Sequence, residues 1–148
     1  MNVKSMLEGP DHIEYVVKDV EGFVEFFKMF GFEVFRRTDH HHGSVEMKLP
    51  GNDFIFEFHA KEGSENLGIE HISFATHDID ALAAELKAKK IDLDGPKFIP
   101  PTDRVIFNCK DPNGFKFQIA STEPVAIEKY KKLRARASDT KKFFERKP

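Results

Sequence analysis

The sequence predicts an α+β fold in which two tandem β-α-β-β-β modules form one curved mixed sheet, with a helix of each module on its outer face and another helix at the C-terminus. The first reason is an internal repeat: subtracting 59 from the numbers of residues 71–93 gives residues of similar chemistry, so that His71 corresponds to His12 and Phe74 to Tyr15. The second reason is a series of short alternating strands around each helical stretch. Two copies are too few for a solenoid, which needs about three, so we expect the modules to face each other around a shared core.

The composition is that of an ordinary soluble protein. The chain has 148 residues, of which 40% are hydrophobic and 32% charged, and its sixteen Phe against no Trp predict an interior built from Phe. A net charge of -2 gives no overall attraction to nucleic acid or membrane, and no stretch approaches the roughly 20 apolar residues of a membrane span. The single Cys109 and the lack of a signal-like N-terminus favour a cytoplasmic location.

The first module is expected at residues 10–61, after an N-terminal lead-in at residues 1–9. Asp19 stands where a helix N-cap belongs, and Gly31 follows the helix as a C-terminal glycine would. The expected strands are 11–18, 32–38, 44–49 and 54–60.

The second module is expected at residues 67–121, after a short polar linker. Asp78 is the predicted N-cap of a helix at 79–90, and Asp111-Pro112-Asn113-Gly114 is a turn, because Pro presets φ and Asn-Gly accepts the left-handed region. The expected strands are 68–76, 91–94, 104–109 and 115–120.

Residues 122–148 form a basic C-terminal helical extension with nine Lys or Arg against four acidic residues. A basic helix can contact nucleic acid or a membrane. This one has a thin apolar stripe and no aromatic interleaving, so we expect it to lie over the body of the protein or on a partner subunit.

Strand alternation places polar residues of both modules on one side of the sheet. Each apolar face must be covered by its helix, which leaves the opposite, concave faces to carry His12, Glu57, His71 and Gln118. Two imidazoles, a carboxylate and an amide oxygen suit a divalent metal ion, namely Ni, Co, Zn, Mn or Fe. A site between the modules is therefore expected to hold such an ion.

Three motifs carry a resemblance to a known family. They are Asp-His-Ile-Glu-Tyr-Val-Val-Lys-Asp-Val from residue 11, Glu-His-Ile-Ser-Phe-Ala-Thr-His-Asp-Ile from residue 70 and Asp-Pro-Asn-Gly-Phe-Lys-Phe-Gln-Ile from residue 111. Over roughly residues 10–121 the chain resembles the vicinal oxygen chelate superfamily, also called the glyoxalase/bleomycin resistance/dioxygenase family.

In members such as glyoxalase I and methylmalonyl-CoA epimerase, the first and last strands of each module supply the metal ligands. The resemblance therefore implies His12, Glu57, His71 and Gln118 as ligands here. The last position is usually Glu in such enzymes and often the catalytic base. With Gln118 there, Glu57 is the remaining carboxylate of the set and is predicted to be the base.

The resemblance implies a glyoxalase-like, metal-dependent lyase or isomerase that acts on a small substrate with vicinal oxygens through an enediolate-type intermediate. Two alternatives stay open: an Fe(II)-dependent dioxygenase, because His12, His71 and Glu57 form a set of two His and one carboxylate, and a non-catalytic ligand-binding protein of the bleomycin-resistance kind. The expected partners are a small-molecule substrate and a second copy of the chain in a homodimer. Arg104, Asn108 and Lys116 are the candidate substrate-binding residues.

Other histidines have weaker signals. Residues 40–42 are three consecutive His in a loop between two strands, and a solvated loop is favoured over a metal-binding one. His59 and His77 share strand faces with the predicted ligands and are expected to lie beside them.

Overall fold

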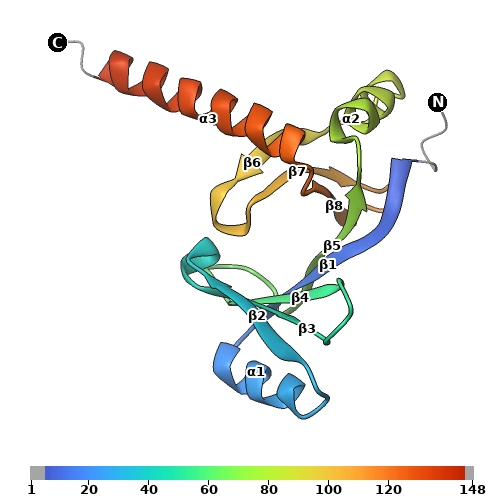
Figure 1. Cartoon of the computed structure of the whole chain (residues 1–148), viewed down its shortest axis with the longest axis vertical. Coiled ribbons are helices and arrows are strands. Elements are labelled where there is room, and N and C mark those ends of the chain that lie inside the picture. Colours follow the sequence, from blue (N-terminus) through green and yellow to red (C-terminus); the bar gives the residue numbers. More distant parts are fainter. Residues whose placement is uncertain (1–5, 146–148) are drawn as a thin grey trace.

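The computed structural model describes residues 6–145, with side chains described for residues 6–138 (Figure 1). The predicted lead-in and C-terminal extension thus lie partly outside the described residues. The strands are β1 (Leu7–Val17), β2 (Glu33–Thr38), β3 (Ser44–Lys48), β4 (Ile55–Ala60), β5 (Gly68–Thr76), β6 (Asp94–Ile99), β7 (Arg104–Lys110) and β8 (Lys116–Ser121). The helices are α1 (Val20–Lys28), α2 (Ile79–Ala88) and α3 (Pro124–Glu145), with 3₁₀ turns η2 (His40–His42) and η3 (Pro100–Thr102).

The α+β fold class is confirmed. All eight strands form one mixed sheet in the order β2-β3-β4-β1-β5-β8-β7-β6. The two modules meet where β1 and β5 pair antiparallel, while β1 pairs parallel with β4 and β5 pairs parallel with β8. The first strands of the two modules are therefore neighbours at the centre of the sheet, which brings the repeated His positions together.

Each module has its own apolar core between the sheet and a helix. Asp19 caps α1 by accepting a hydrogen bond from the backbone N–H of Gly22, and Asp78 caps α2 in the same way through Ala81. α1 packs against β2, β3 and β4, and α2 against β6, β7 and β8. The buried core residues are Val17, Val24, Val45, Met47 and Phe58 in the first module and Met6, Ile79, Leu82, Ala83, Phe98, Val105, Phe107 and Ile119 in the second.

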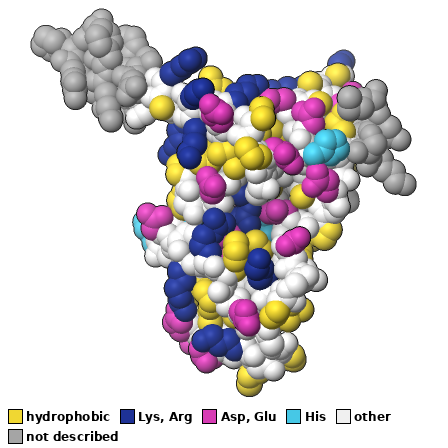
Figure 2. Space-filling model, in the orientation of Figure 1, with side chains coloured by type: hydrophobic (Ala, Val, Ile, Leu, Met, Phe, Trp, Pro, Cys, Tyr) yellow, Lys and Arg dark blue, Asp and Glu magenta, His cyan; other side chains and the backbone are white. Residues whose placement is uncertain are grey.

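The basic C-terminal helix lies over the second module, as one of the sequence interpretations expected. α3 contacts β6 and β7, and Lys129 and Tyr130 both donate hydrogen bonds to the carboxylate of Asp80 on α2. Lys and Arg side chains gather on the surface around α3 (Figure 2). No helix among the described residues is long and apolar enough to cross a membrane.

Two strands, β1 and β6, differ from their predicted bounds by more than one residue at an end. β1 begins at Leu7 because Met6 is buried in the core of the second module and residues 7–10 pair with the end of β5. β6 was predicted at 91–94 but lies at Asp94–Ile99 and includes Pro96. Pro96 is tolerated because β6 is an edge strand whose pairing with β7 shifts register between Asp94 and Lys97.

Phe58 tests the core of the first module. Its side chain is fully buried, with its ring 4.8 Å from that of Phe23 and 5.6 Å from that of Phe27. Phe58→Ala should lower the free energy of unfolding by ~3–5 kcal/mol through a core cavity. The matched control is Phe115→Ala, because Phe115 is 46% exposed and its loss should cost less than ~1 kcal/mol. Urea unfolding measures both, and equal losses would contradict this description of the core.

Candidate functional site

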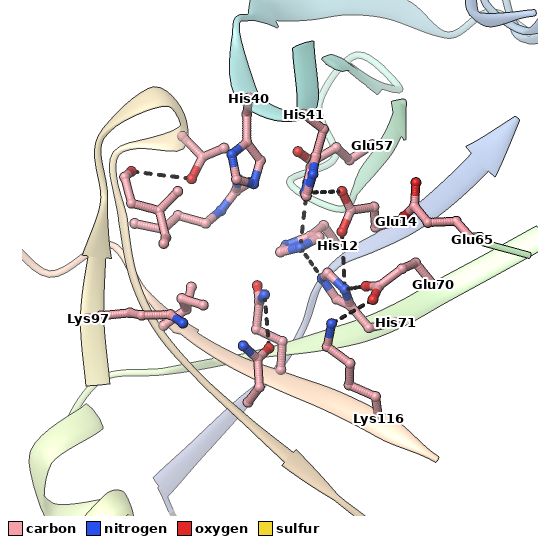
Figure 3. A pocket seen from close by; sticks show the side chains of 16 residues that line it. His12, Glu14, His40, His41, Glu57, Glu65, Glu70, His71, Lys97 and Lys116 are labelled. Carbon is pink, nitrogen blue, oxygen red and sulfur yellow. Dashed lines mark hydrogen bonds and ion pairs between the residues drawn. The ribbon is translucent and has the colours of Figure 1, made fainter. Parts of the chain in front are cut away.

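The polar faces of both modules enclose one cavity of about 200 Å³ (Figure 3). All seven of the predicted site residues line it. The complete lining is His12, Glu14, His40, His41, Glu57, Glu65, Glu70, His71, Lys97, Ile99, Thr102, Arg104, Ile106, Asn108, Lys116 and Gln118. One chain thus supplies residues from both modules to the cavity.

The centre of the site is a pair of buried histidines. His12 on β1 and His71 on β5 point toward one another, with their Nε2 atoms 3.1 Å apart (Figure 3). Both side chains are buried. The pair exists because β1 and β5 are adjacent and each repeats a His on its polar face.

Carboxylates hold the other nitrogen of each ring. His12 Nδ1 lies 2.6 Å from Asp11 Oδ2, and His71 Nδ1 lies 3.1 Å from Glu14 Oε2 and also contacts Glu70. An Nδ1–H donated to a carboxylate leaves the Nε2 lone pair facing the cavity. The two Nε2 atoms therefore need a positive charge between them, supplied by a shared proton or by a metal ion.

The spacing of the two nitrogens fits a metal ion. Ligands about 2.1 Å from one ion, at tetrahedral or right angles to each other, lie roughly 3.0–3.4 Å apart. Burial, together with Arg104 and His71, lowers the pKa of His12 against the opposing effect of Asp11, which favours the neutral, metal-binding imidazole. Histidine ligands whose second nitrogen is held by a carboxylate are typical of metal sites.

Two oxygen donors complete the predicted set. Glu57 Oε2 on β4 lies 3.7 Å from His12 Nε2, and Glu57 Oε1 accepts a hydrogen bond from Ser44. The amide nitrogen of Gln118 on β8 donates to Asn108 at 3.3 Å, so its oxygen is the atom that it can offer to a cation. The chemistry of these donors fits a divalent first-row metal.

The carboxyl groups of Glu57 and Glu14 are held in opposite charge states. Burial, Glu14 and Glu46 raise the pKa of Glu57 to about 8. Burial also opposes ionisation of Glu14, but His59, His71 and His41 outweigh it and lower the pKa of Glu14. Without a metal, Glu57 is therefore the protonated carboxyl group and Glu14 the ionised one.

The three predicted substrate-binding residues have different partners. The buried Arg104 lies 3.1 Å from Asp11 and 2.8 Å from Glu46, while its Nη1 has no hydrogen-bond partner among the described residues. Lys116 pairs with Glu70 at 2.5 Å, and Asn108 holds Gln118. Arg104 thus reaches from the second module to β1 and β3 of the first, with one donor atom still available.

Sequence reasoning missed the carboxylates that surround the two histidines. Asp11, Glu14 and Glu70 each contact one of them, and Glu46 lies opposite Glu57 in the β3–β4 register. Strand parity did contain a signal, because Glu14 lies two residues after His12 on the same face. The burial of a Glu on the strand face of a predicted metal site indicates a functional group. Its spacing in the sequence is a weaker indication.

Two of the interpretations of the other histidines need correction, those of residues 40–42 and of His77. Residues 40–42 do not form a purely solvated loop, because His40 and His41 line the cavity while only His42 is largely exposed. His77 lies at the edge of the molecule, half exposed and 3.4 Å from Glu8, because the chain leaves β5 just before it. His59 does lie beside the site: burial alone would lower its pKa, but Glu14 and Glu65 raise it to about 9.

Comparison with known proteins identifies the family. The model of the Glyoxalase/Bleomycin resistance protein/Dioxygenase superfamily matches residues 9–119. A search of curated protein sequences gave no match.

Solved structures share the fold at low sequence identity. Methylmalonyl-CoA epimerase from Mycobacterium tuberculosis superposes with a TM-score of 0.71 at 18% identity, over 84% of this chain and 94% of that one. Streptomyces coelicolor methylmalonyl-CoA epimerase in complex with 2-nitronate-propionyl-CoA gives a TM-score of 0.66 at 22% identity, over 78% and 98% of the chains. A hypothetical protein from Bacillus halodurans C-125 gives 0.64 at 13% identity, over 77% and 94%.

Proposed function

Because the chain belongs to the Glyoxalase/Bleomycin resistance protein/Dioxygenase superfamily, we propose that it is a metal-dependent isomerase or lyase of the glyoxalase type. Its substrate is a small molecule, or the acyl end of a larger one, with two neighbouring oxygens. The observation that carries this proposal is the His12–His71 pair, whose Nε2 atoms meet 3.1 Å apart in a cavity shared by both modules.

Four side chains would hold the ion: His12, Glu57, His71 and Gln118. A divalent cation bound there would polarise the substrate oxygens and stabilise the negative charge that develops when the proton between them is removed. Asp11, Glu14 and Glu70 fix the ring orientation of the two histidines, so the nitrogens are aimed before any ion or substrate arrives.

Glu57 is the proposed proton carrier. It is buried at the cavity wall, 3.7 Å from His12, and Ser44 holds one of its oxygens. Neighbouring Glu46 lies in contact with two guanidinium groups, those of Arg36 and Arg104, whereas Glu57 has no ion pair with Lys or Arg among the described residues. Burial and the neighbouring carboxylates raise the pKa of Glu57 to about 8, and a cation held beside it would favour its ionised form. The ionised carboxylate could then take a proton from the substrate and return it to the neighbouring carbon, or to the same carbon from the other side.

The rest of the cavity favours an anionic or oxygen-rich substrate. Lys97, Arg104 and Lys116 approach it from the second module, and Arg104 Nη1 is without a hydrogen-bond partner among the described residues. A carboxylate or thioester oxygen would satisfy such a donor. Structural neighbours are methylmalonyl-CoA epimerases, which makes acyl-CoA thioesters the first substrates to test.

One experiment separates this function from its alternatives. Protein made without a His tag is stripped of metal, reloaded separately with Ni, Co, Zn, Mn or Fe(II), and incubated in D₂O with methylmalonyl-CoA or, separately, with α-oxygenated carbonyl compounds. Metal-dependent incorporation of deuterium at the carbon next to the carbonyl, measured by mass spectrometry, supports the isomerase.

The two-His, one-carboxylate arrangement of His12, His71 and Glu57 makes a ferrous dioxygenase the second candidate. Oxygen consumption with Fe(II) and no deuterium incorporation would favour it. Ligand binding with neither reaction, at any metal loading, would contradict both enzymes and favour a binding protein.

A further inference from the structure

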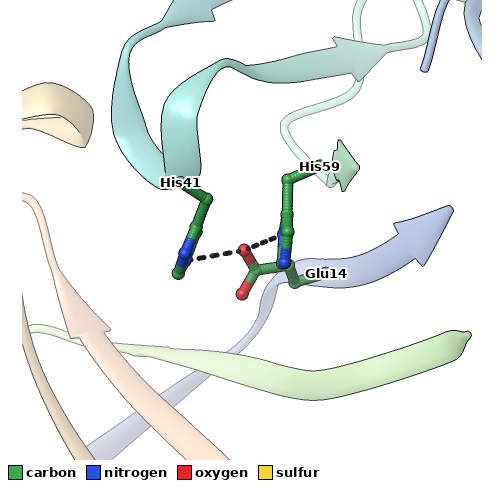
Figure 4. A group of neighbouring side chains, drawn as sticks. All are labelled: Glu14, His41 and His59. Carbon is green, nitrogen blue, oxygen red and sulfur yellow. Dashed lines mark ion pairs between the residues drawn. The ribbon is translucent and has the colours of Figure 1, made fainter. Parts of the chain in front are cut away.

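A second cluster of ligand atoms lies on the far side of Glu14 from His71. His41 Nε2 and His59 Nδ1 lie 3.3 Å and 3.0 Å from the same carboxylate oxygen, Glu14 Oε1 (Figure 4). The three atoms lie within 4.8 Å of one another and come from η2, β4 and β1. We propose that Glu14, His41 and His59 form a second metal site, which takes a first-row transition ion such as Zn²⁺ or Co²⁺.

Two of the three ligand atoms lack other partners. Glu14 Oε1 and His59 Nδ1 are buried and lie 3.0 Å apart as an ion pair, and no group outside the cluster forms a hydrogen bond with either atom among the described residues. Without an ion, a proton on His59 compensates for the burial of these two atoms. An ion about 2.1 Å from each would satisfy both, because their separation is that of neighbouring ligands on one metal.

The arrangement around the cluster repeats that of the first site. His59 Nε2 lies 3.0 Å from Glu65 Oε2, so a carboxylate fixes the ring while Nδ1 faces the proposed ion. The rings of His41 and His59 stack with centroids 4.3 Å apart at 19°. Two imidazoles select a transition ion over Mg²⁺ or Ca²⁺, which prefer oxygen ligands alone.

The backbone of η2 is shaped to present His41. His41 has φ 50° and ψ 39°, a left-handed conformation that is uncommon for a residue with a side chain. This conformation costs some free energy, and here it belongs to the residue whose side chain reaches the cluster. Because the His41 side chain is 32% exposed, ions can reach the cluster from solvent.

Glu14 would connect the two sites. Its Oε1 faces the proposed second ion, while its Oε2 holds His71 Nδ1 at 3.1 Å. An ion at the second site would therefore fix the carboxylate that orients a ligand of the first, as a structural or regulatory metal does.

Titration of tag-free protein with Zn²⁺, followed by isothermal calorimetry and elemental analysis, tests the proposal. The wild type should bind two ions per chain, and His41→Ala should bind one, because its second site is weakened by more than the ~10–100-fold that losing an orienting partner causes. The matched control is His42→Ala: His42 is the next residue, also has a positive φ, of 61°, and is 93% exposed outside the cluster. The His42→Ala variant should still bind two ions per chain. Absorption spectra of the Co²⁺-loaded proteins should show the loss of one coordination environment in His41→Ala and no loss in His42→Ala.

Three results would overturn the second site. The first is a wild type that binds only one ion per chain. The second is an equal loss of bound ion in His41→Ala and His42→Ala, which would indicate adventitious binding by the His-rich loop. The third is a loss of both ions in His71→Ala. A wild type that binds one ion, which only His71→Ala removes, would leave the proposed function standing without the second site.

Discussion

Replacing His71 by alanine should remove the metal ion of the first site while the protein stays folded. His71 Nε2 is one of the two nitrogens that face the centre of the cavity, so its loss leaves His12 without the opposing ligand. We expect the metal affinity of this site to fall ~100-fold or more. Losing a ligand should cost more than losing a residue that only orients a ligand. Turnover that depends on the metal should fall with it.

The fold should survive because the groups around His71 keep other partners. Glu14 still lies beside His59, and Glu70 still pairs with Lys116. The apolar core on the opposite face of β5 is not touched. Circular dichroism and urea unfolding should therefore resemble those of the wild type more closely than those of a core variant.

His77→Ala is the matched control for this experiment. It removes a histidine just beyond the same strand, but one that is half exposed and outside the cavity. Elemental analysis should find one ion fewer per chain in His71→Ala and no change in His77→Ala. The same metal content in both variants would show that the site is not centred on His71.

Most of the fold could be predicted because the helix caps and the internal repeat can be read directly from the sequence. Asp19 and Asp78 mark the starts of the two helices by caps that the sequence displays, and the repeat relating His12 to His71 fixes the two-module plan. Edge strand β6 was placed wrongly because its pattern is interrupted by Pro96, and only its pairing with β7 fixes its bounds. Register across the sheet is a tertiary property that a single strand does not encode.

The candidate site could be predicted only for the residues that the repeat relates. Glu14 has no acidic counterpart in the second module, where the equivalent residue is Ser73, so the pseudosymmetry gave no reason to choose it. The contact of Arg104 with Glu46 joins strands of different modules, and its existence depends on how the modules pack. The approach of His41 to the cavity depends on left-handed backbone angles that a run of three His does not signal.

The largest effect on turnover is expected from Glu57→Gln. The amide oxygen can still coordinate a cation, so part of the metal should remain, but the amide cannot carry a proton. Loss of a positioned general base costs ~100-fold or more in turnover. Deuterium incorporation per bound metal, measured on reloaded protein, separates this effect from simple metal loss.

Gln118→Glu provides the opposite change at the pseudosymmetric position. It adds a carboxylate on β8 where Glu57→Gln removes one on β4, and it disrupts only the 3.3 Å hydrogen bond to Asn108. It should retain the metal and keep or raise the turnover, because a second carboxylate then faces the substrate. If net charge alone governed the site, metal content would follow the charge in both variants while turnover per bound metal stayed constant.

A Glu57→Gln variant with normal turnover per bound metal would show that Glu57 is not the base. Glu46 would then be the next carboxylate to test, because it lies opposite Glu57 in register and is fully buried on the same face. Glu46→Gln would remove the partner of both Arg36 and Arg104 and leave their charges partly unpaired, so it should also destabilise the fold. Glu57→Gln breaks no ion pair with Lys or Arg among the described residues, so a loss of turnover at unchanged stability points to proton transfer by Glu57 itself.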